Sequence, residues 1–344
     1  MSPAPRLSVG LPVYNGEHYL PGSIEALLGQ TYTDFELIIS DNASTDGTPE
    51  ICEGYAKQDS RIRYIRQPRN IGLSPNHNFV VREARGEMFK WAAADDLYGR
   101  DLLRCCVEAL DEHPGVVLAH SYTAAIDADG TVTHALDYPL ATASPHAPER
   151  LRSFLFGSSG LFETNGPQGR RLIRVNNDGI LRACDEYGVI RTSVLRKIAP
   201  LGSYHHSDRI VVVELILRGP FHITPDWLYF RRDHPDRTYN VSPSLRTRCE
   251  ILDPVRKDKL RNPTARLVAE YFWGYLAAIQ RAPISAADKR ECYRDLVHWM
   301  LDRAVNKVSP RGFDQSVGDL PVMPADRNVS VDAVVAGQQA RLAR

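Results

Sequence analysis

The first 110 residues alternate four times between strand-like and helix-like segments, and no other feature of the sequence limits the fold as strongly. Short apolar runs typical of buried strands alternate with segments whose apolar residues recur at helical spacing. The expected strands are residues 6–13, 35–40, 61–65 and 87–93, and the expected helices are residues 18–30, 48–58, 74–85 and 98–113. Such an alternation predicts an α/β fold, in which right-handed crossovers build a mostly parallel sheet covered by helices on both faces.

Two of these helices carry clear local signals. In residues 18–30 the apolar side chains that share one helical face are Leu20, Ile24, Leu27 and Leu28. For the helix at 48–58 we expect Thr48 as the N-cap, with Pro49 at the first helical position and Glu50 directly after it. Both residue choices are typical of a helix start, because a hydroxyl satisfies a free backbone N–H and proline needs none.

The alternation stops after Pro114. Asp129 and Gly130 have the chemistry of a hairpin turn and lie between two strand-like runs. Residues 140–182 are poorly periodic and rich in Ser, Pro, Gly and Arg, which indicates a mobile loop, a lid or a substrate-facing insertion.

Regular patterns return further along the chain. Residues 207–219 predict a helix with a strong apolar stripe, and residues 221–234 predict a strand, a turn and a second strand. From about residue 245 onward the sequence is mainly helical, and residues 309–344 carry few packing signals.

Composition excludes several classes of protein. The 42 basic and 42 acidic residues cancel, whereas a nucleic-acid scaffold would normally show a basic excess. No stretch approaches about 18 uninterrupted apolar residues, so we expect no transmembrane segment, and residues 1–16 lack the apolar core of a secretory signal. The six cysteines show no CxxC spacing and are interpreted as reduced thiols, which makes the cytoplasm the expected location.

Polar residues collect directly after each of the four expected strands. Asn15 follows the first strand, Asp41 the second, Asn70 the third, and the adjacent pair Asp95 and Asp96 the fourth. In an open α/β sheet, ligands bind in the crevice outside the carboxyl ends of the strands. Loops are usually polar, so one such loop means little, but four at one edge predict a binding site.

The residue types at this edge indicate a phosphorylated ligand and a cation. The carboxylates of Asp95 and Asp96 are hard oxygen ligands suited to Mg²⁺ or Mn²⁺, and a divalent ion would offset their mutual repulsion. Arg69 offers a forked contact to a phosphate. The P-loop and the GxGxxG fingerprint are both absent, so the usual ATPase and dinucleotide arrangements are excluded.

Two long stretches resemble the family 2 glycosyltransferases. "LSVGLPVYNGEHYLPGSIEALLGQTYTDFELIISDNASTDGT" looks like the opening of that family, and "RNIGLSPNHNFVVREARGEMFKWAAADDLYGRDLL" continues the match in the same order. The resemblance is strong to about residue 105 and sparser from 187 to 240. It implies a GT-A type, Rossmann-like fold that binds a nucleoside diphosphate sugar.

The resemblance also implies roles for individual residues. The nucleotide pocket would be lined by Pro12, Tyr14, Asn15 and Glu17. Asp41 would read the base. Around the sugar-phosphate lie Arg69, Asn70 and Gly72. Asp95 and Asp96 match the aspartate motif that holds the ribose and the metal, with Asp96 as the expected metal ligand; many members have a further Asp where this chain has Ala93.

A catalytic base and a further metal ligand are expected downstream. Asp208 matches the position of the family's base, which takes the proton of the acceptor hydroxyl; the alternative is that Asp208 or Ser207 only caps the helix. In "YFRRDHPDRT", His234 is expected to complete the metal shell, and Arg232 to contact the diphosphate. A lone histidine is as often an ordinary packing residue, so that alternative stays open.

The predicted domains are a GT-A domain at 1–240 and a helical extension at 241–344, loosely packed from 309. Within the GT-A domain, residues 1–114 form the nucleotide-sugar half and residues 115–240 the acceptor half, with a variable region at 140–206. A homodimer through the C-terminal helices is a further expectation.

The predicted activity is metal-dependent transfer of a sugar, with Mn²⁺ or Mg²⁺, from a nucleoside diphosphate donor (UDP favoured) to an acceptor hydroxyl, with inversion. The acceptor is a glycan, a lipid-linked molecule or a small molecule. One alternative is a nucleotidyltransferase of related fold, although "PVYNGEHYL" lacks the glycine-rich basic loop of such enzymes. Another is an inactive nucleotide-sugar-binding protein, which Ala93 suggests. A third, a scaffold that docks through its C-terminal helices, would bind no nucleotide.

Overall fold

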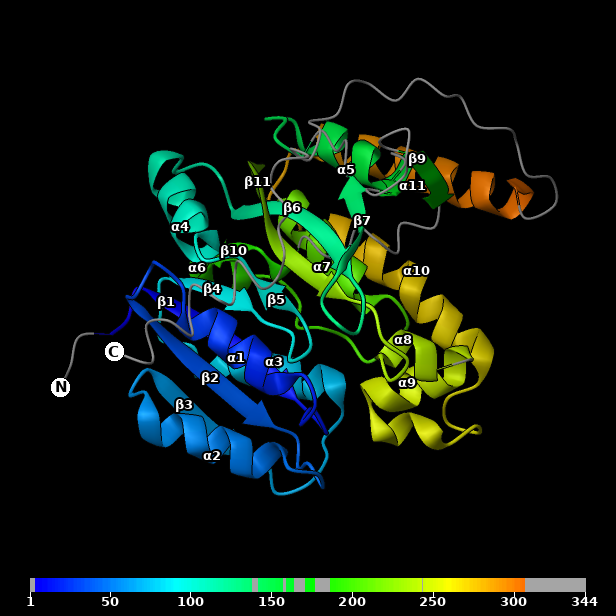
Figure 1. The fold of residues 1–344 in the computed structure, drawn as a ribbon. Coiled ribbons are helices and arrows are strands. Elements are labelled where there is room, and N and C mark those ends of the chain that lie inside the picture. Colours follow the sequence, from blue (N-terminus) through cyan, green and yellow to red (C-terminus); the bar gives the residue numbers. More distant parts are fainter. Residues whose placement is uncertain are drawn as a thin grey trace.

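A mixed sheet flanked by helices organises the molecule (Figure 1). The computed structural model describes residues 4–137, 142–156, 159–163, 171–176, 186–242 and 244–306. Along the main path of the sheet the strand order is β3-β2-β1-β4-β10-β6-β7-β8-β9, and β11 pairs with β5 and β6.

The first half of the sheet is parallel, as the alternating pattern predicts. It consists of β1 (Leu7–Val13), β2 (Phe35–Asp41), β3 (Ile62–Arg66) and β4 (Met88–Trp91). Every residue of β1 and β2 is buried, because helices cover both faces. The connecting helices are α1 (Leu20–Leu28), α2 (Thr48–Gln58) and α3 (Leu73–Glu83).

The predicted N-cap of α2 is wrong by one residue. Gly47 is the N-cap, and Thr48 is already the first helical residue. The carboxylate of Asp46 accepts the Thr48 N–H at 3.1 Å and so replaces the expected cap. The Thr48 hydroxyl is thereby released to accept the N–H of Gly16 at 2.9 Å, which joins the loop after β1 to the loop after β2.

The second half of the sheet is mainly antiparallel. β10 (Val189–Arg191) lies between β4 and β6 (Leu118–Ile126) and is antiparallel to both. Further strands extend this half: β5 (Leu97–Tyr98), β7 (Val132–Asp137), β8 (Ser159–Glu163), β9 (Arg171–Asn176) and β11 (Phe221–Arg232). Helix α4 (Leu102–Glu112) follows β5 and packs on β6 and β11.

The predicted hairpin between β6 and β7 is present. The Asp127 N–H donates to the Thr131 carbonyl at 2.9 Å, and the Gly130 N–H donates to the Asp127 carbonyl at 3.1 Å. Gly130 has φ +89°, a value that glycine adopts readily.

Two segments differ from their sequence predictions. Residues 140–182 include helix α5 (Ala147–Phe156) and the strands β8 and β9, so this region is not a continuous loop; its other parts lie outside the described residues. The expected turn at Pro225 does not form. β11 continues past it, and the register shifts between Thr224 and Trp227 and again before Tyr229, because pairing with β6 keeps the strand extended.

Helices from the last third of the chain complete the core. Helix α7 (Ser207–Ile216) is buried on every side, not along one stripe, because α5 and α10 both pack against it. Helix α6 (Thr192–Leu195) precedes it. The later helices are α8 (Thr238–Val241), α9 (Leu245–Leu252), a 3₁₀ helix at Pro254–Lys257, α10 (Thr264–Arg281) and α11 (Ala286–Asn306).

Side chains of α10 and α11 share one apolar cluster with α7 and with β4 (Phe89 and Trp91), so the helical segment packs directly on the sheet. The expected loose tail from 309 lies outside the described residues. Within the described ranges, no helix combines the length and apolarity needed to cross a bilayer. The cysteines in the same ranges are free thiols, namely Cys52, Cys105, Cys106, Cys249 and Cys292.

Candidate active site

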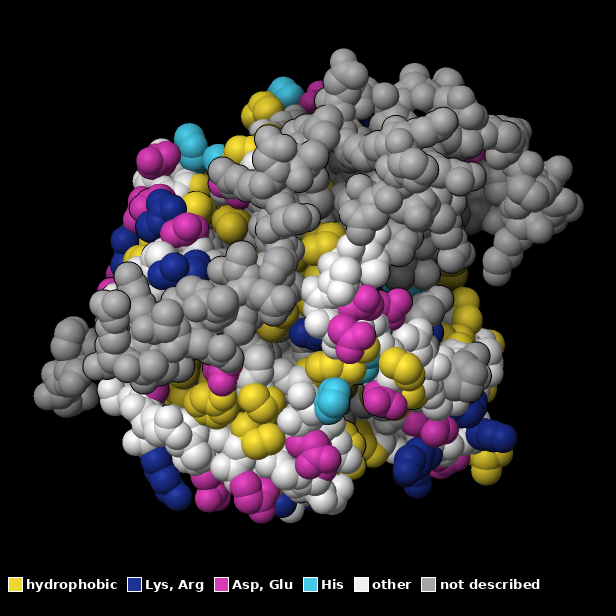
Figure 2. Space-filling model, in the orientation of Figure 1, with side chains coloured by type: hydrophobic (Ala, Val, Ile, Leu, Met, Phe, Trp, Pro, Cys, Tyr) yellow, Lys and Arg dark blue, Asp and Glu magenta, His cyan; other side chains and the backbone are white. Residues whose placement is uncertain are grey.

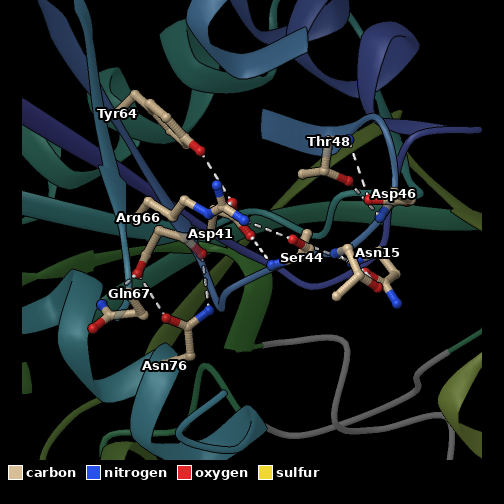
Figure 3. Close-up of polar contacts among 12 residues, drawn as sticks. Asn15, Asp41, Ser44, Asp46, Thr48, Tyr64, Arg66, Gln67 and Asn76 are labelled. Atoms are coloured by element: carbon tan, nitrogen blue, oxygen red, sulfur yellow. Dashed lines mark hydrogen bonds and ion pairs between the residues drawn. The ribbon is translucent and has the colours of Figure 1, made fainter. Parts of the chain in front are cut away.

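The loops after β1 and β2 form one hydrogen-bonded unit (Figure 3). Asp41 ends β2 with a fully buried side chain; one carboxylate oxygen accepts the Ser44 N–H at 2.8 Å and the other accepts the Tyr64 hydroxyl at 3.0 Å. The Arg66 guanidinium lies 3.5 Å from the same carboxylate. Because both oxygens already have protein partners, Asp41 shapes this loop, and its contact with a base stays a prediction.

Asn15 and Glu17 reach from the first loop to the second. The Asn15 N–H donates to the Ser44 hydroxyl at 2.9 Å, and its side-chain oxygen accepts the Thr45 N–H at 2.9 Å. The Glu17 carboxylate accepts the Gly47 N–H at 2.6 Å. Asn15 has φ +50°, a left-handed conformation that asparagine tolerates better than most residues. These contacts hold both loops in one conformation before any ligand arrives.

The other residues expected in the nucleotide pocket differ in exposure. Pro12 is buried inside β1 and pairs in register with Ser40, whereas the Tyr14 ring is 49% exposed beside it. Arg69 is exposed after β3, the outermost strand of the parallel half. Three strand spacings, or about 14 Å, separate β3 from β4, the strand that precedes the aspartate pair.

Gly72 joins this edge to the helical segment. The Asn70 side-chain oxygen accepts the Gly72 N–H at 2.9 Å, and the Asn42 amide donates to the Gly72 carbonyl at 3.2 Å. At φ +95°, a Cβ on Gly72 would lie 2.6 Å from the carbonyl oxygen of Leu252. Only glycine fits here, because the end of α9 packs against the loop backbone.

The two adjacent aspartates have different environments. Asp96 is 1% exposed; one of its oxygens accepts the Arg232 N–H at 2.8 Å, and the other accepts the Tyr229 hydroxyl. Burial and the nearby charge of Asp95 raise the pKa of Asp96 to about 6. Both oxygens of Asp96 thus already have one protein donor each, and its expected role as the metal ligand stays a prediction.

Asp95 is the accessible member of the pair. Its side chain is 29% exposed, and one carboxylate oxygen lies 3.0 Å from His234 Nε2. Burial raises the pKa of Asp95, but the hydrogen bond from His234 and the charges of Arg237 and His234 outweigh burial, so the pKa is lowered. Asp95 is thus an ionised carboxylate at neutral pH, with an imidazole beside it.

His234 contacts Asp95 through Nε2 and Tyr19 through its ring. The centroid of its ring lies 4.5 Å from that of Tyr19, while its buried Nδ1 atom has no partner in the part of the chain that the structure describes. Within the described ranges, no group of three or more His, Cys, Asp or Glu side chains is placed to hold a metal ion. Asp95 and His234 still fit one, because Mg²⁺ usually binds one or two protein ligands and completes its shell with substrate phosphates and water.

Arg232 is a structural clamp. Its Nε donates to the Asp95 carbonyl at 2.9 Å, and its NH1 nitrogen donates to the carbonyls of Asp127 and Ala128 at 3.1 and 2.7 Å. Its guanidinium also lies over the Tyr19 ring. Arg232 is only 7% exposed and is tied to the β6–β7 turn, and its contact with a diphosphate stays a prediction.

Arg237 is a site residue that the sequence reasoning missed. Its positive charge helps to lower the pKa of Asp95 and offsets part of the rise in the pKa of Asp96. It is half-buried directly before α8, and within the described part of the chain no carboxylate lies within 4.0 Å of it. The signal was present, since Arg237 follows His234 by three residues in the same charged loop.

Lys90 of β4 is a buried cation whose charge interacts with Asp96. The fully buried ammonium group donates to the Tyr187 carbonyl and lies over the rings of Tyr98 and Tyr229, and burial lowers its pKa to about 8. The rings of Tyr98 and Tyr229 are stacked, with centroids 5.8 Å apart. These aromatic side chains are therefore core residues, and Tyr229 reaches the site only through its hydroxyl.

Asp208 is the one residue of α7 that is not buried. Its carboxylate accepts the backbone N–H of Arg209, in the first turn of the helix, at 2.9 Å, so the alternative that Asp208 caps the helix stays open. His206, two residues before Asp208, has φ +58°. Such a left-handed conformation at a bulky residue is typical of functional sites.

Helix α3 fixes the loop that precedes α7, the helix of Asp208. The Ser74 hydroxyl donates to the Gly202 carbonyl at 2.9 Å, and the Asn78 side chain bonds both backbone groups of Leu201 at 2.8 Å. The Asp208 charge also acts on the buried His77, whose carbonyl accepts the Trp91 indole N–H. Since α3 begins at the carboxyl edge, Asp208 lies on the same side of the sheet as the aspartate pair.

On the face drawn in Figure 2, acidic, basic and histidine side chains lie close together near the centre.

The chain matches the model of Glycosyl transferase family 2 over residues 8–198, which is more than half of its length. The chain therefore belongs to this family, as its sequence resemblance predicts.

Relatives and a solved structure agree with this membership. Glycosyltransferase GlyG of Streptococcus pneumoniae serotype 4 (strain ATCC BAA-334 / TIGR4) is 31% identical over 124 residues, which cover 36% of this chain and 41% of GlyG. Chondroitin synthase of Escherichia coli is 25% identical over 207 residues, 60% of this chain and 28% of that protein. The chain thus spans less than half the length of these relatives.

The crystal structure of S. aureus TarS 1-349 in complex with UDP-GlcNAc matches with a TM-score of 0.50 and 14% identity, over 92% of this chain and 96% of that one. At this identity the likeness concerns the fold, and it confirms the expected GT-A type.

Proposed function

We propose that the protein transfers a sugar from a nucleoside diphosphate sugar, with UDP as the favoured nucleotide, to an acceptor hydroxyl, with inversion. The observation that carries this proposal is the pairing of the exposed Asp95 carboxylate with His234 at 3.0 Å, beside the preformed loops of Asn15 and Asp41. Family membership supports the reaction class, and the complex of TarS with UDP-GlcNAc supports a nucleoside diphosphate sugar as the donor class.

The residues divide into three roles. Asp95 and His234 would hold a divalent cation, Mn²⁺ or Mg²⁺, which when bound stabilises the negative charge of the departing diphosphate. We propose Asp95 in place of Asp96, because the oxygens of Asp96 are occupied by Tyr229 and Arg232. Arg237 takes the diphosphate contact first expected of Arg232, since its charge acts on both aspartates and is not neutralised by a described carboxylate.

Asp208 serves as the general base. It is the accessible carboxylate of an otherwise buried helix, and the contacts of α3 fix the loop that precedes this helix. In the inverting reaction it removes the proton of the acceptor hydroxyl as that oxygen attacks the anomeric carbon. The nucleotide end is left to Tyr14, Asn15, Glu17 and Asp41, whose loops are joined by hydrogen bonds.

A thermal-shift screen of UDP-, GDP- and dTDP-sugars with and without Mn²⁺ tests the donor class. A donor at 100 times its Kd stabilises the fold by about 2.7 kcal/mol, so the preferred donor is expected to raise the Tm by several degrees. Absence of a shift with every donor would refute the proposal.

The Asp208→Asn variant tests the base. It is expected to bind the same donor with unchanged affinity and to lose about a hundredfold or more in transfer rate. Asp226→Asn, an exposed carboxylate on β11, is the matched control and should retain both properties. An Asp208→Asn variant with full activity would remove Asp208 from the mechanism.

A further inference from the structure

A cavity lies at the edge of the sheet opposite the candidate active site. It has a volume of about 470 Å³ and is lined by Arg6, Arg85, Gly86, Glu87, Met88, Arg191, Thr192, Ser193 and Arg196. Small-molecule sites in proteins usually have volumes of about 300–1,000 Å³. The cavity is therefore large enough for a ligand of several heavy atoms.

Sheet topology explains why these residues meet. Arg6 precedes β1 and Met88 begins β4, so both lie at the amino ends of parallel strands. β10 runs antiparallel to β4, and its last residue, Arg191, pairs with Met88. The seven residues of β1 separate this edge from the carboxyl edge, a distance of about 20 Å. The cavity is thus distinct from the site of Asp95 and His234.

Three of the four arginines, Arg85, Arg191 and Arg196, form no ion pair with a carboxylate in the described part of the chain. Arg191 donates to the backbone carbonyls of Leu110, His113 and Val116, and Arg196 donates to the carbonyl of Ala84.

Across the described ranges no carboxylate lies within 4.0 Å of Arg85, Arg191 or Arg196, whereas Arg6 pairs with Asp111 at 2.5 Å. Arg85 and Arg196 are exposed, so their guanidinium groups are accessible. Glu87 is the one carboxylate among the lining residues.

Thr192 adds a second observation. It lines the same cavity and is 3% exposed, yet its hydroxyl oxygen has no hydrogen-bond partner among the described residues. Buried polar atoms are normally satisfied, and a specific exception often marks a site that another group completes. A hydroxyl and several guanidinium groups together match the oxygen atoms of a phosphoryl group, which arginine binds through two parallel N–H bonds.

We propose that this arginine cavity binds the phosphoryl groups of an anionic ligand other than the sugar donor. Arg85 and Arg196 supply the direct contacts, Arg191 adds fixed positive charge, and Thr192 supplies a hydroxyl. The ligand is either a soluble phosphate ester or a phosphate-bearing lipid headgroup at a membrane surface. The site would hold the protein to a phosphorylated partner while the opposite edge stays open to the donor.

Calorimetric titration with inorganic pyrophosphate in the presence of EDTA tests the site, since chelation removes any cation that would hold pyrophosphate at Asp95. The variant Arg85→Gln/Arg196→Gln is compared with wild type and with Arg261→Gln/Arg294→Gln, a control that removes the same charge from exposed positions. We expect the cavity variant to lose about tenfold or more in affinity and the control to behave as wild type. Ser193→Glu, which adds negative charge to the lining, should weaken binding in the same way.

Cosedimentation with phosphatidylcholine vesicles, with and without phosphatidic acid, separates the two ligand sources. Sedimentation that requires phosphatidic acid and is lost in the cavity variant identifies a lipid headgroup. Pyrophosphate binding without sedimentation identifies a soluble ligand. Absence of binding to both probes in the wild type, or equal losses in the cavity and control variants, would overturn the proposal.

Discussion

The nucleotide loops and the aspartate pair lie at the same edge of the sheet, yet they are built over very different lengths of chain. Hydrogen bonds around Asn15 and Asp41 join residues 3 to 30 positions apart. Those around Asp95 and Asp96 join residues 133 to 139 positions apart. The first region forms within one run of strands and helices, whereas the second requires β11 to pair with β5 and β6.

This difference separates local from global control of the site. The loops after β1 and β2 position each other and need only the parallel half of the sheet. The aspartate pair depends on the register of β11, because Tyr229 and the Arg232 backbone decide which carboxylate is buried. We therefore expect changes in the first region to affect nucleotide binding, and changes in the second to affect catalysis or the stability of the sheet.

The largest expected effect is that of Asp95→Asn. Loss of the accessible carboxylate should lower the transfer rate by about a thousandfold, with a Tm near that of wild type, because Asp95 is partly exposed. Steady-state transfer assays with the preferred donor and Mn²⁺ measure this. Asp41→Asn is the comparison, expected to raise the KM for the donor about tenfold with kcat retained. A larger loss of kcat in Asp41→Asn than in Asp95→Asn would break the distinction between the two regions.

The next effect is on stability. Arg232→Lys replaces a fork that reaches three carbonyls with a single ammonium group, so the free energy of unfolding should fall by about 2–3 kcal/mol. Urea denaturation measures this change. Arg261→Lys, whose side chain is 79% exposed, is the control and should change the value by about 0.5 kcal/mol or less. Equal stabilities of the two variants would show that the clamp is dispensable.

The smallest effect is a pH dependence that depends on Asp96. Its folded pKa of about 6 exceeds the unfolded value of about 3.9, so the native state binds more protons than the unfolded state between those pH values. Stability from this group is therefore lost as pH rises from about 4 to about 6.

Asp96→Asn removes that titration. Relative to the variant, the wild type should lose about 1–2 kcal/mol of unfolding free energy across this window, measured by urea denaturation at several pH values. An unchanged difference between wild type and variant at every pH would contradict the buried, proton-binding environment described for Asp96.

Local pattern was sufficient for the parallel half of the fold and for the residues along its edge. The period of apolar residues locates strands and helices in the first 110 residues because each element buries one face against its neighbour in sequence. It was insufficient for β11, where Pro225 suggests a turn but pairing with β6 maintains an extended strand. Local pattern also did not predict the contacts of Arg232. This residue carries the charge expected of a phosphate ligand, but its guanidinium donates hydrogen bonds to backbone carbonyls.

By itself, the sequence determined the α/β architecture, the family and the edge at which Asp95 and Asp96 lie, because periodicity and strand ends are encoded locally. Only the tertiary structure decided which aspartate is buried, brought the charge of Arg237 to act on the pair and gathered four arginines at the opposite edge. Those outcomes depend on β10 and β11, whose pairing brings together residues that are more than one hundred positions apart. Burial and charge at such contacts follow from the packing of the whole sheet, and no short window of sequence contains that information.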